Sequence, residues 1–171
     1  MGFQDSAWKK YLLFGLNGTK ATGASPAAAG TTVPGATNLN EGGGLLIGIT
    51  QESVAVVDAL IVAPAVGTLD VVIQSSIDAD QAGAGNWYDV VRFPQALAAA
   101  AAIRYVATLS RGFNKVVAAP TLTGDSSGGT LTLAVNTLIP DALGNALRIV
   151  LVAGVGTSVG AVQRITVGMS K

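Results

Sequence analysis

The chain of 171 residues contains no histidine and no cysteine, and only 5% of its residues are aromatic. Without cysteine it has no disulfide framework and no thiolate metal site. Histidines, thiols and metal clusters supply most of the poised bases and nucleophiles of hydrolases and transferases. The composition therefore argues against these enzyme classes, and it predicts a protein without a cofactor.

Charge is scarce and evenly balanced. The chain has ten lysines and arginines and ten aspartates and glutamates, and the charges are scattered singly apart from the pair Lys9-Lys10. Such a chain has no long-range field to attract nucleic acid or an acidic membrane. The apolar stretch Leu147–Val162 is interrupted by glycine, serine and threonine and is shorter than the roughly 20 residues of a membrane span. Neither a nucleic acid nor a membrane is an expected partner.

The composition changes near residue 50. From Asn17 to Gly44 the chain is mostly small and polar, and such a stretch buries too little surface to offset its ordering entropy. The segment before it is aromatic, and positions 8, 11 and 12 fit one helical face weakly. We expect residues 1–50 to form an extended N-terminal arm. The residues expected to anchor it to a partner are Phe3, Trp8, Lys9, Lys10, Tyr11, Leu12 and Phe14.

Residues 51–171 are predicted to form an all-β domain. Short runs rich in Val, Ile, Leu and Thr alternate with turns that contain Gly, Pro, Asp and Asn. The expected strands are Glu52–Val62, Thr68–Ile77, Asn86–Phe93, Ile103–Leu109, Lys115–Ala118, Thr130–Asn136, Ala146–Val152 and Val162–Val167. This spacing is typical of an antiparallel β-sandwich, with a jelly roll as the first choice of topology. Gln95–Ala102 fits either one or two helical turns or a loop.

Two loops resemble ligand-binding motifs. Asp78-Ala79-Asp80 followed by Gly83 is the beginning of a calcium-type loop, but it lacks the third oxygen ligand and the distal glutamate. Asp78 and Asp80 are therefore weak metal candidates, and a hairpin tip is the favoured interpretation. The loop from Gly124 to Gly129 leads into an expected strand and not into a helix, so a hairpin loop is favoured over a phosphate site.

Carboxylate chemistry and sugar binding have less support. Asp and Glu side chains that could meet as a glycosidase pair are Glu41, Glu52, Asp58, Asp70 and Asp89, but nothing in their spacing favours it. Sugar-binding clefts are usually lined by aromatic residues. Trp87 and Tyr105 are the best candidates for such platforms, yet packing within the fold is the more common role of such residues.

Three segments within residues 68–152 carry a resemblance to a known group. TLDVVIQSSIDADQAGAGNWYDVVRF is an LDV-type strand, an Asp-rich turn and a Trp-centred strand; IRYVATL and IPDALGNALRIVLV follow. The pattern resembles small virion proteins of tailed bacteriophages, although sugar-binding sandwiches share similar strand and turn chemistry. The resemblance implies a jelly-roll-like capsid decoration (cement) protein, often a trimer.

The expected function is therefore that of a non-enzymatic structural virion protein. It would be made in the host cytoplasm, bind the outside of a phage capsid and stabilise it by bridging neighbouring subunits. Its partners would be the major capsid protein or other virion subunits, and further copies of itself, with a homotrimer favoured. The alternative is a carbohydrate- or receptor-binding sandwich of a head fibre or tail, and a carboxylate hydrolase ranks last.

Overall fold

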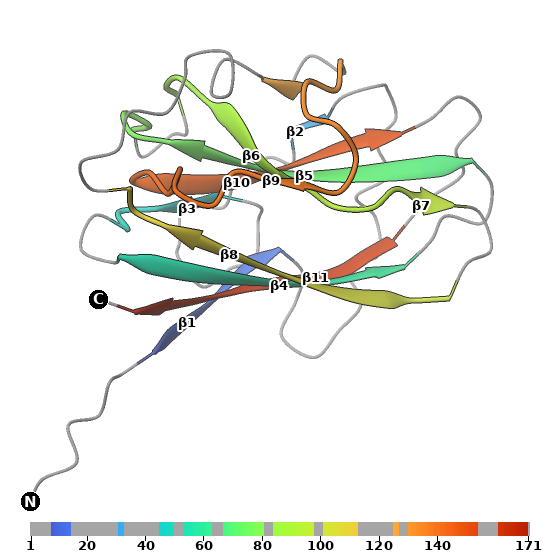
Figure 1. Cartoon of the computed structure of the whole chain (residues 1–171), viewed down its shortest axis with the longest axis horizontal. Helices are drawn as coiled ribbons and strands as arrows, with labels where there is room; N and C mark the ends of the chain where they lie inside the picture. The colour runs from blue at the N-terminus through green and yellow to red at the C-terminus, as the bar shows by residue number, and fades with distance from the viewer. Residues whose placement is uncertain are drawn as a thin grey trace, which may run out of the picture.

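Two antiparallel β-sheets stack face to face and enclose one main apolar core (Figure 1). The computed structural model describes residues 8–14, 31–32, 45–49, 53–62, 67–80, 84–97, 101–112, 125–126, 130–153 and 161–170. Within these ranges every named element is a strand. The predicted all-β sandwich is confirmed, but the strand order does not confirm the jelly-roll connectivity.

The four-stranded sheet has the order β1-β11-β4-β8. Its strands are β1 (Lys9–Phe14), β4 (Val54–Val62), β8 (Ile103–Ser110) and β11 (Ala161–Ser170). Along β4, Ala55, Val57, Ala59 and Ile61 are at most 2% exposed, whereas the residues between them are half-buried. This alternation places one face of the sheet on the core and leaves the other face open.

The seven-stranded sheet has the order β2-β10-β5-β6-β9, with β3 also paired to β10 and β7 to β5. Its strands are β2 (Thr31–Thr32), β3 (Leu45–Ile47), β5 (Thr68–Ser76), β6 (Tyr88–Arg92), β7 (Ala96–Leu97), β9 (Thr137–Leu138) and β10 (Ala146–Ala153). Every residue of β5 from Leu69 to Ser76 is buried, so this strand is covered on both faces. On the side of β5 that points away from the main core, Leu131 packs against Val72 and Val150.

Residues 1–50 contribute strands to both sheets wherever they are described. β1 pairs with β11, and both β2 and β3 pair with β10. Leu13 and Ile49 are 0% and 2% exposed and belong to the main core. The boundary predicted at residue 50 therefore does not separate these segments from the sandwich. The helical face predicted for residues 8, 11 and 12 is wrong, because Lys9–Phe14 is an edge strand.

Most of the expected strands of the sandwich are present, with one clear correction. Thr130–Asn136 is not a strand; only the next two residues, Thr137–Leu138, pair with β6. The leucines of this segment alternate because Leu131 packs on the side of the seven-stranded sheet that points away from the core, while Leu133 packs against the main core. Within Gln95–Ala102, Ala96–Leu97 form the strand β7, and none of the other described residues is helical. The expected strand Lys115–Ala118 lies outside the described residues.

Candidate interaction surface

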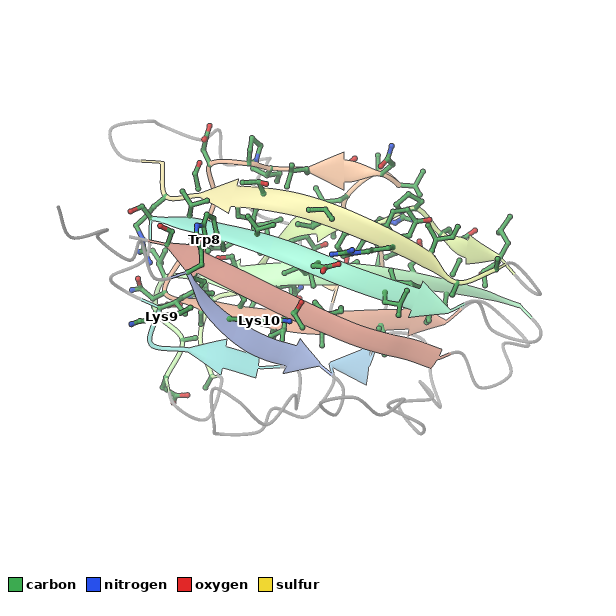
Figure 2. The ribbon with its side chains drawn as sticks, turned by 90° about the horizontal axis from the view of Figure 1, so that it is seen from below. Trp8, Lys9 and Lys10 are labelled. Carbon is green, nitrogen blue, oxygen red and sulfur yellow. The ribbon has the colours of Figure 1, made fainter. Side chains whose placement is uncertain are left out.

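Trp8, Lys9 and Lys10 lie at the start of β1, on the edge of the four-stranded sheet (Figure 2). Trp8 is 53% exposed, and both lysines are exposed. The indole covers the backbone of Gly168 on β11, where a Cβ atom would lie 3.5 Å from Cε3 of the ring. The ring therefore rests on the sheet while about half of its surface stays open to a partner.

The remaining predicted anchor residues are only partly described. Tyr11, Leu12 and Phe14 lie in β1 and pair with β11 through their backbones, while their side chains and the whole of Phe3 lie outside the described part. The sequence analysis did not single out Leu13, which is fully buried. The available signal was the run of large apolar residues at 11–14, which fits an edge strand as well as it fits an anchor.

The outward side of the four-stranded sheet carries exposed apolar residues at both of its edges. Val106 on β8 is 60% exposed, and Trp8 beside β1 is 53% exposed. The strand register places Val106 opposite Asp58 of β4, so these two side chains share one face. We call this surface the outer face; its residues are Trp8, Val56, Asp58, Leu60, Arg104, Val106, Thr108 and Gly168.

An ion pair lies at the centre of the outer face. Arg104 donates from Nε to Oδ1 of Asp58 at 2.7 Å and from Nη2 to Oδ2 at 2.6 Å. The hydrogen bonds to Asp58, and then its charge, raise the pKa of Arg104. An exposed pair of this kind adds little stability. The pairing does mean that the charge of Arg104 on the outer face is balanced by a neighbouring carboxylate.

The outward side of the seven-stranded sheet is covered, and a buried carboxylate holds the covering segment. Asp89 on β6 is 1% exposed and accepts hydrogen bonds on both oxygens. Oδ1 accepts from Nε2 of Gln74 at 2.7 Å and from the backbone N–H of Ser126 at 3.1 Å. Oδ2 accepts from the hydroxyls of Ser126 and Thr132. Since a buried charge is costly unless it is fully hydrogen-bonded, Asp89 has a structural role here.

A second buried carboxylate holds the neighbouring part of the same cover. Asp70 on β5 is 3% exposed, and its Oδ1 accepts from Nε and Nη2 of Arg92 at 3.0 and 2.7 Å. Its Oδ2 accepts from Nε2 of Gln95 at 2.7 Å. Arg92 also donates from Nη1 to the carbonyl of Leu133 at 2.6 Å. The segment that sequence patterning mistook for a strand is therefore attached by side chains.

These contacts decide how the five acidic residues considered for glycoside hydrolysis are placed. Asp70 and Asp89 accept hydrogen bonds from neighbouring side chains on the seven-stranded sheet. Asp58 binds Arg104, and both of these lie on the four-stranded sheet. Glu41 and Glu52 lie outside the described residues. None of the three described carboxylates is paired with another across a cleft, as a glycosidase would require.

Trp87 is a packed residue. It is 7% exposed, and the guanidinium carbon of Arg148 lies 4.3 Å from the centroid of its ring. Burial lowers the pKa of Arg148, while the charge of Asp125, 3.5 Å from Nη2, acts in the opposite direction. Phe93 is 4% exposed and stacks on the half-buried Tyr105 at 5.8 Å. The prediction that Trp87 packs within the fold is confirmed, which removes it as a sugar platform.

The Asp78–Asp80 loop is closed by its own hydrogen bonds. Asp78 accepts from the backbone N–H and Nδ2 of Asn86 at 2.8 and 2.6 Å and from Oγ of Ser76 at 2.9 Å. These bonds, the Asn86 backbone bond first, lower the pKa of Asp78. Asp80 accepts from the N–H of Ala84 at 2.9 Å. Among the residues the structure describes, no three His, Cys, Asp or Glu side chains are grouped as metal ligands.

No protein-family model, curated protein or solved structure matches this chain. In the described ranges, no helix has the length and apolar character needed to span a membrane. The chemistry of the outer face is therefore the basis on which a function is inferred.

Proposed function

We propose that this chain is a non-enzymatic structural protein of a phage virion that binds the outside of the capsid and stabilises it by bridging neighbouring subunits. Its partner is the major capsid protein or another virion subunit, and it is made in the host cytoplasm. The resemblance of residues 68–152 to small virion proteins supports this proposal. The contacts of the two sheets support it independently.

The observation that carries the proposal is the exposed indole of Trp8 on the outer face. Trp is the residue type most enriched in the energetic centres of protein interfaces. Here the ring is held against Gly168, so little side-chain entropy is lost when a partner covers it. Lys10 pairs with Gly168 in the ladder, so it lies on the same face as Trp8 and adds a positive charge that would favour an acidic partner surface.

The use of the buried carboxylates also supports a structural role. A general acid or base must reach a reacting group, whereas both carboxylate oxygens of Asp70 and of Asp89 accept hydrogen bonds from other residues of the protein. They fix a covering segment and leave the opposite sheet open. This division of roles suits a rigid platform that meets a partner through the outer face.

The proposal is tested by co-sedimentation with capsid shells assembled from a major capsid protein encoded by the same genome. The intact protein is expected to pellet with the shells, and Trp8→Ser is expected to weaken binding about tenfold or more. The matched control is Ile77→Ser, because Ile77 is 66% exposed but lies at the end of β5, on the other sheet. Failure of the intact protein to pellet, or equal binding by both variants, would refute the proposal.

A further inference from the structure

One edge of the four-stranded sheet is free among the described residues, and its backbone groups point outward in a known pattern. At the end of β8, Ser110 donates to the carbonyl of Pro140 at 2.6 Å and accepts from the N–H of Leu143 at 3.0 Å. The next residue, Arg111, donates to Ser53 on the β4 side at 2.8 Å. Ser110 therefore directs both of its backbone groups away from β4.

In an antiparallel ladder this direction alternates from residue to residue. Arg104, Val106 and Thr108 thus present their N–H and C=O groups to the free edge, while Tyr105 and Ala107 bond to β4. Among the described strands, only β4 pairs with β8. The edge offers a row of unpaired donors and acceptors, which is a template for another strand.

The usual protections of such an edge are missing from β8. The pairing with β4 is continuous from Ile103 to Ser110, without a bulge that would twist the edge away. The strand contains no proline, and its only charge is Arg104. That charge is already neutralised by Asp58. Val106, at the middle of the strand, is 60% exposed.

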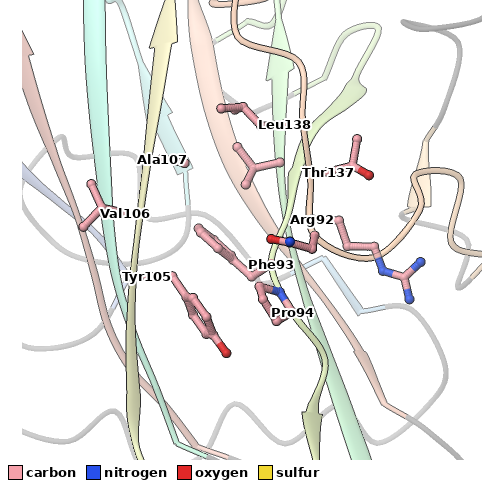
Figure 3. Close-up of a pocket in the computed structure, with 10 residues that line it drawn as sticks. Arg92, Phe93, Pro94, Tyr105, Val106, Ala107, Thr137 and Leu138 are labelled. Atoms are coloured by element: carbon pink, nitrogen blue, oxygen red, sulfur yellow. The ribbon is translucent and has the colours of Figure 1, made fainter.

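An apolar groove of about 180 Å³ runs beside this edge, between β8 and the β6–β9 side of the other sheet (Figure 3). The stacked rings of Phe93 and Tyr105 line it, together with Leu138, which is 40% exposed. Arg92 points its guanidinium away from the groove, where it binds Asp70. The groove therefore accepts apolar side chains of a strand that pairs with β8.

We propose that the occupant is a second copy of this chain, whose β8 pairs antiparallel with the first across a twofold axis at Val106. Val106 then faces Val106 of the second copy, and Arg104 faces Thr108 of the second copy. The outward groups of the three residues make about six hydrogen bonds between the copies. The added strand covers the groove beside Tyr105.

The second copy is favoured by the charges. The twofold at Val106 keeps the two Arg104 side chains apart, each opposite a threonine, whereas a twofold at Arg104 would place like charges against each other. The chain has a net charge of 0, so two copies do not repel each other at long range. The register also leaves Ser110 bonded to the 140–143 segment.

The experiment is sedimentation velocity of the intact protein without shells, over a wide range of concentrations. A monomer–dimer equilibrium is expected. Val106→Lys and Val106→Glu are each expected to weaken the dimer about tenfold or more, because like charges meet on the axis. An equimolar mixture of the two variants restores the dimer. Ile77→Lys, a substitution of a similarly exposed apolar residue, leaves it unchanged.

Amide hydrogen exchange supplies a second readout that does not depend on a substitution. The amides of Val106 and Thr108 gain protection as the protein concentration rises, whereas that of Ala107 is protected at every concentration. A monomer at all concentrations would overturn the proposal, and so would a trimer that both charged variants leave intact. Shell binding is measured separately, so capsid attachment and self-pairing stand or fall independently.

Discussion

Substitution of Leu13 by alanine measures whether the N-terminal segment is part of the fold. Leu13 is 0% exposed, and its neighbours in β1 pair with β11. A fully buried leucine replaced by alanine costs about 2–5 kcal/mol, from lost transfer energy and from the cavity. Because β1 is an edge strand and relaxes more easily than a central one, we expect a loss of about 2–3 kcal/mol in the free energy of unfolding.

The assay is equilibrium unfolding in urea, in which the midpoint falls while the slope stays the same. Lys10→Ala is the matched control on the same strand, because Lys10 is exposed, and it should change the free energy of unfolding by less than about 0.5 kcal/mol. If Leu13→Ala also costs less than about 0.5 kcal/mol, β1 is not docked in solution. Residues 1–50 would then form a separable arm, as the sequence predicts.

Deletion of residues 1–44 removes two paired strands and should lower the thermal midpoint of the remaining chain or prevent its folding, as circular dichroism will show. Asp89→Ala removes the acceptor shared by four hydrogen-bond donors, three of them on the buried residues Gln74 and Ser126, and should cost about 3 kcal/mol or more in urea unfolding. Gly144→Ala should lower the yield of folded protein, because its Cβ would lie 2.2 Å from the carbonyl oxygen of Ser76. The pKa of Asp78 is lowered below 3.8 in the folded protein, so its contribution to the free energy of unfolding is present above pH 3.8 and is lost as the pH falls through the folded pKa. Asp78→Asn should therefore weaken the dependence of stability on pH in this acidic range.

The central strands were predictable because they contain long runs of β-branched residues, which favour buried strands. β4, β5 and β10 match the expected ranges to within two residues at each end. The alternation of Leu69, Val71 and Ile73 with Asp70, Val72 and Gln74 is typical of a strand with one buried face, so the burial of β5 on both faces was not predictable from it. What the pattern did not reveal is that Asp89 and Arg92 on β6 hold a covering segment, through Ser126 and Thr132 and through the carbonyl of Leu133.

The errors arose where side-chain contacts replace backbone ladders. The alternation in Thr130–Asn136 is real, but Leu131 and Leu133 pack against two different apolar surfaces, and no described strand pairs with this backbone in a ladder. Similarly, the partner of β1 is β11, about 150 residues further along the chain, so no local pattern identifies it. Trp8 was predicted to anchor a partner, and the structure leaves about half of it exposed, whereas its position over Gly168 depends on that long-range pairing.

The two sheets differ in how they satisfy their outward-pointing residues, and this difference directs a partner to one side. The seven-stranded sheet carries the buried carboxylate of Asp89 on its outward side, and two of the residues that donate to it, Ser126 and Thr132, belong to the cover. A partner that displaced this cover would leave Asp89 without these donors. The four-stranded sheet has its one described ion pair, Asp58–Arg104, already closed, and its apolar residues lose only water on contact. A partner that binds the outer face therefore gains from burial without breaking the fold, whereas one that binds the opposite sheet must first displace part of it.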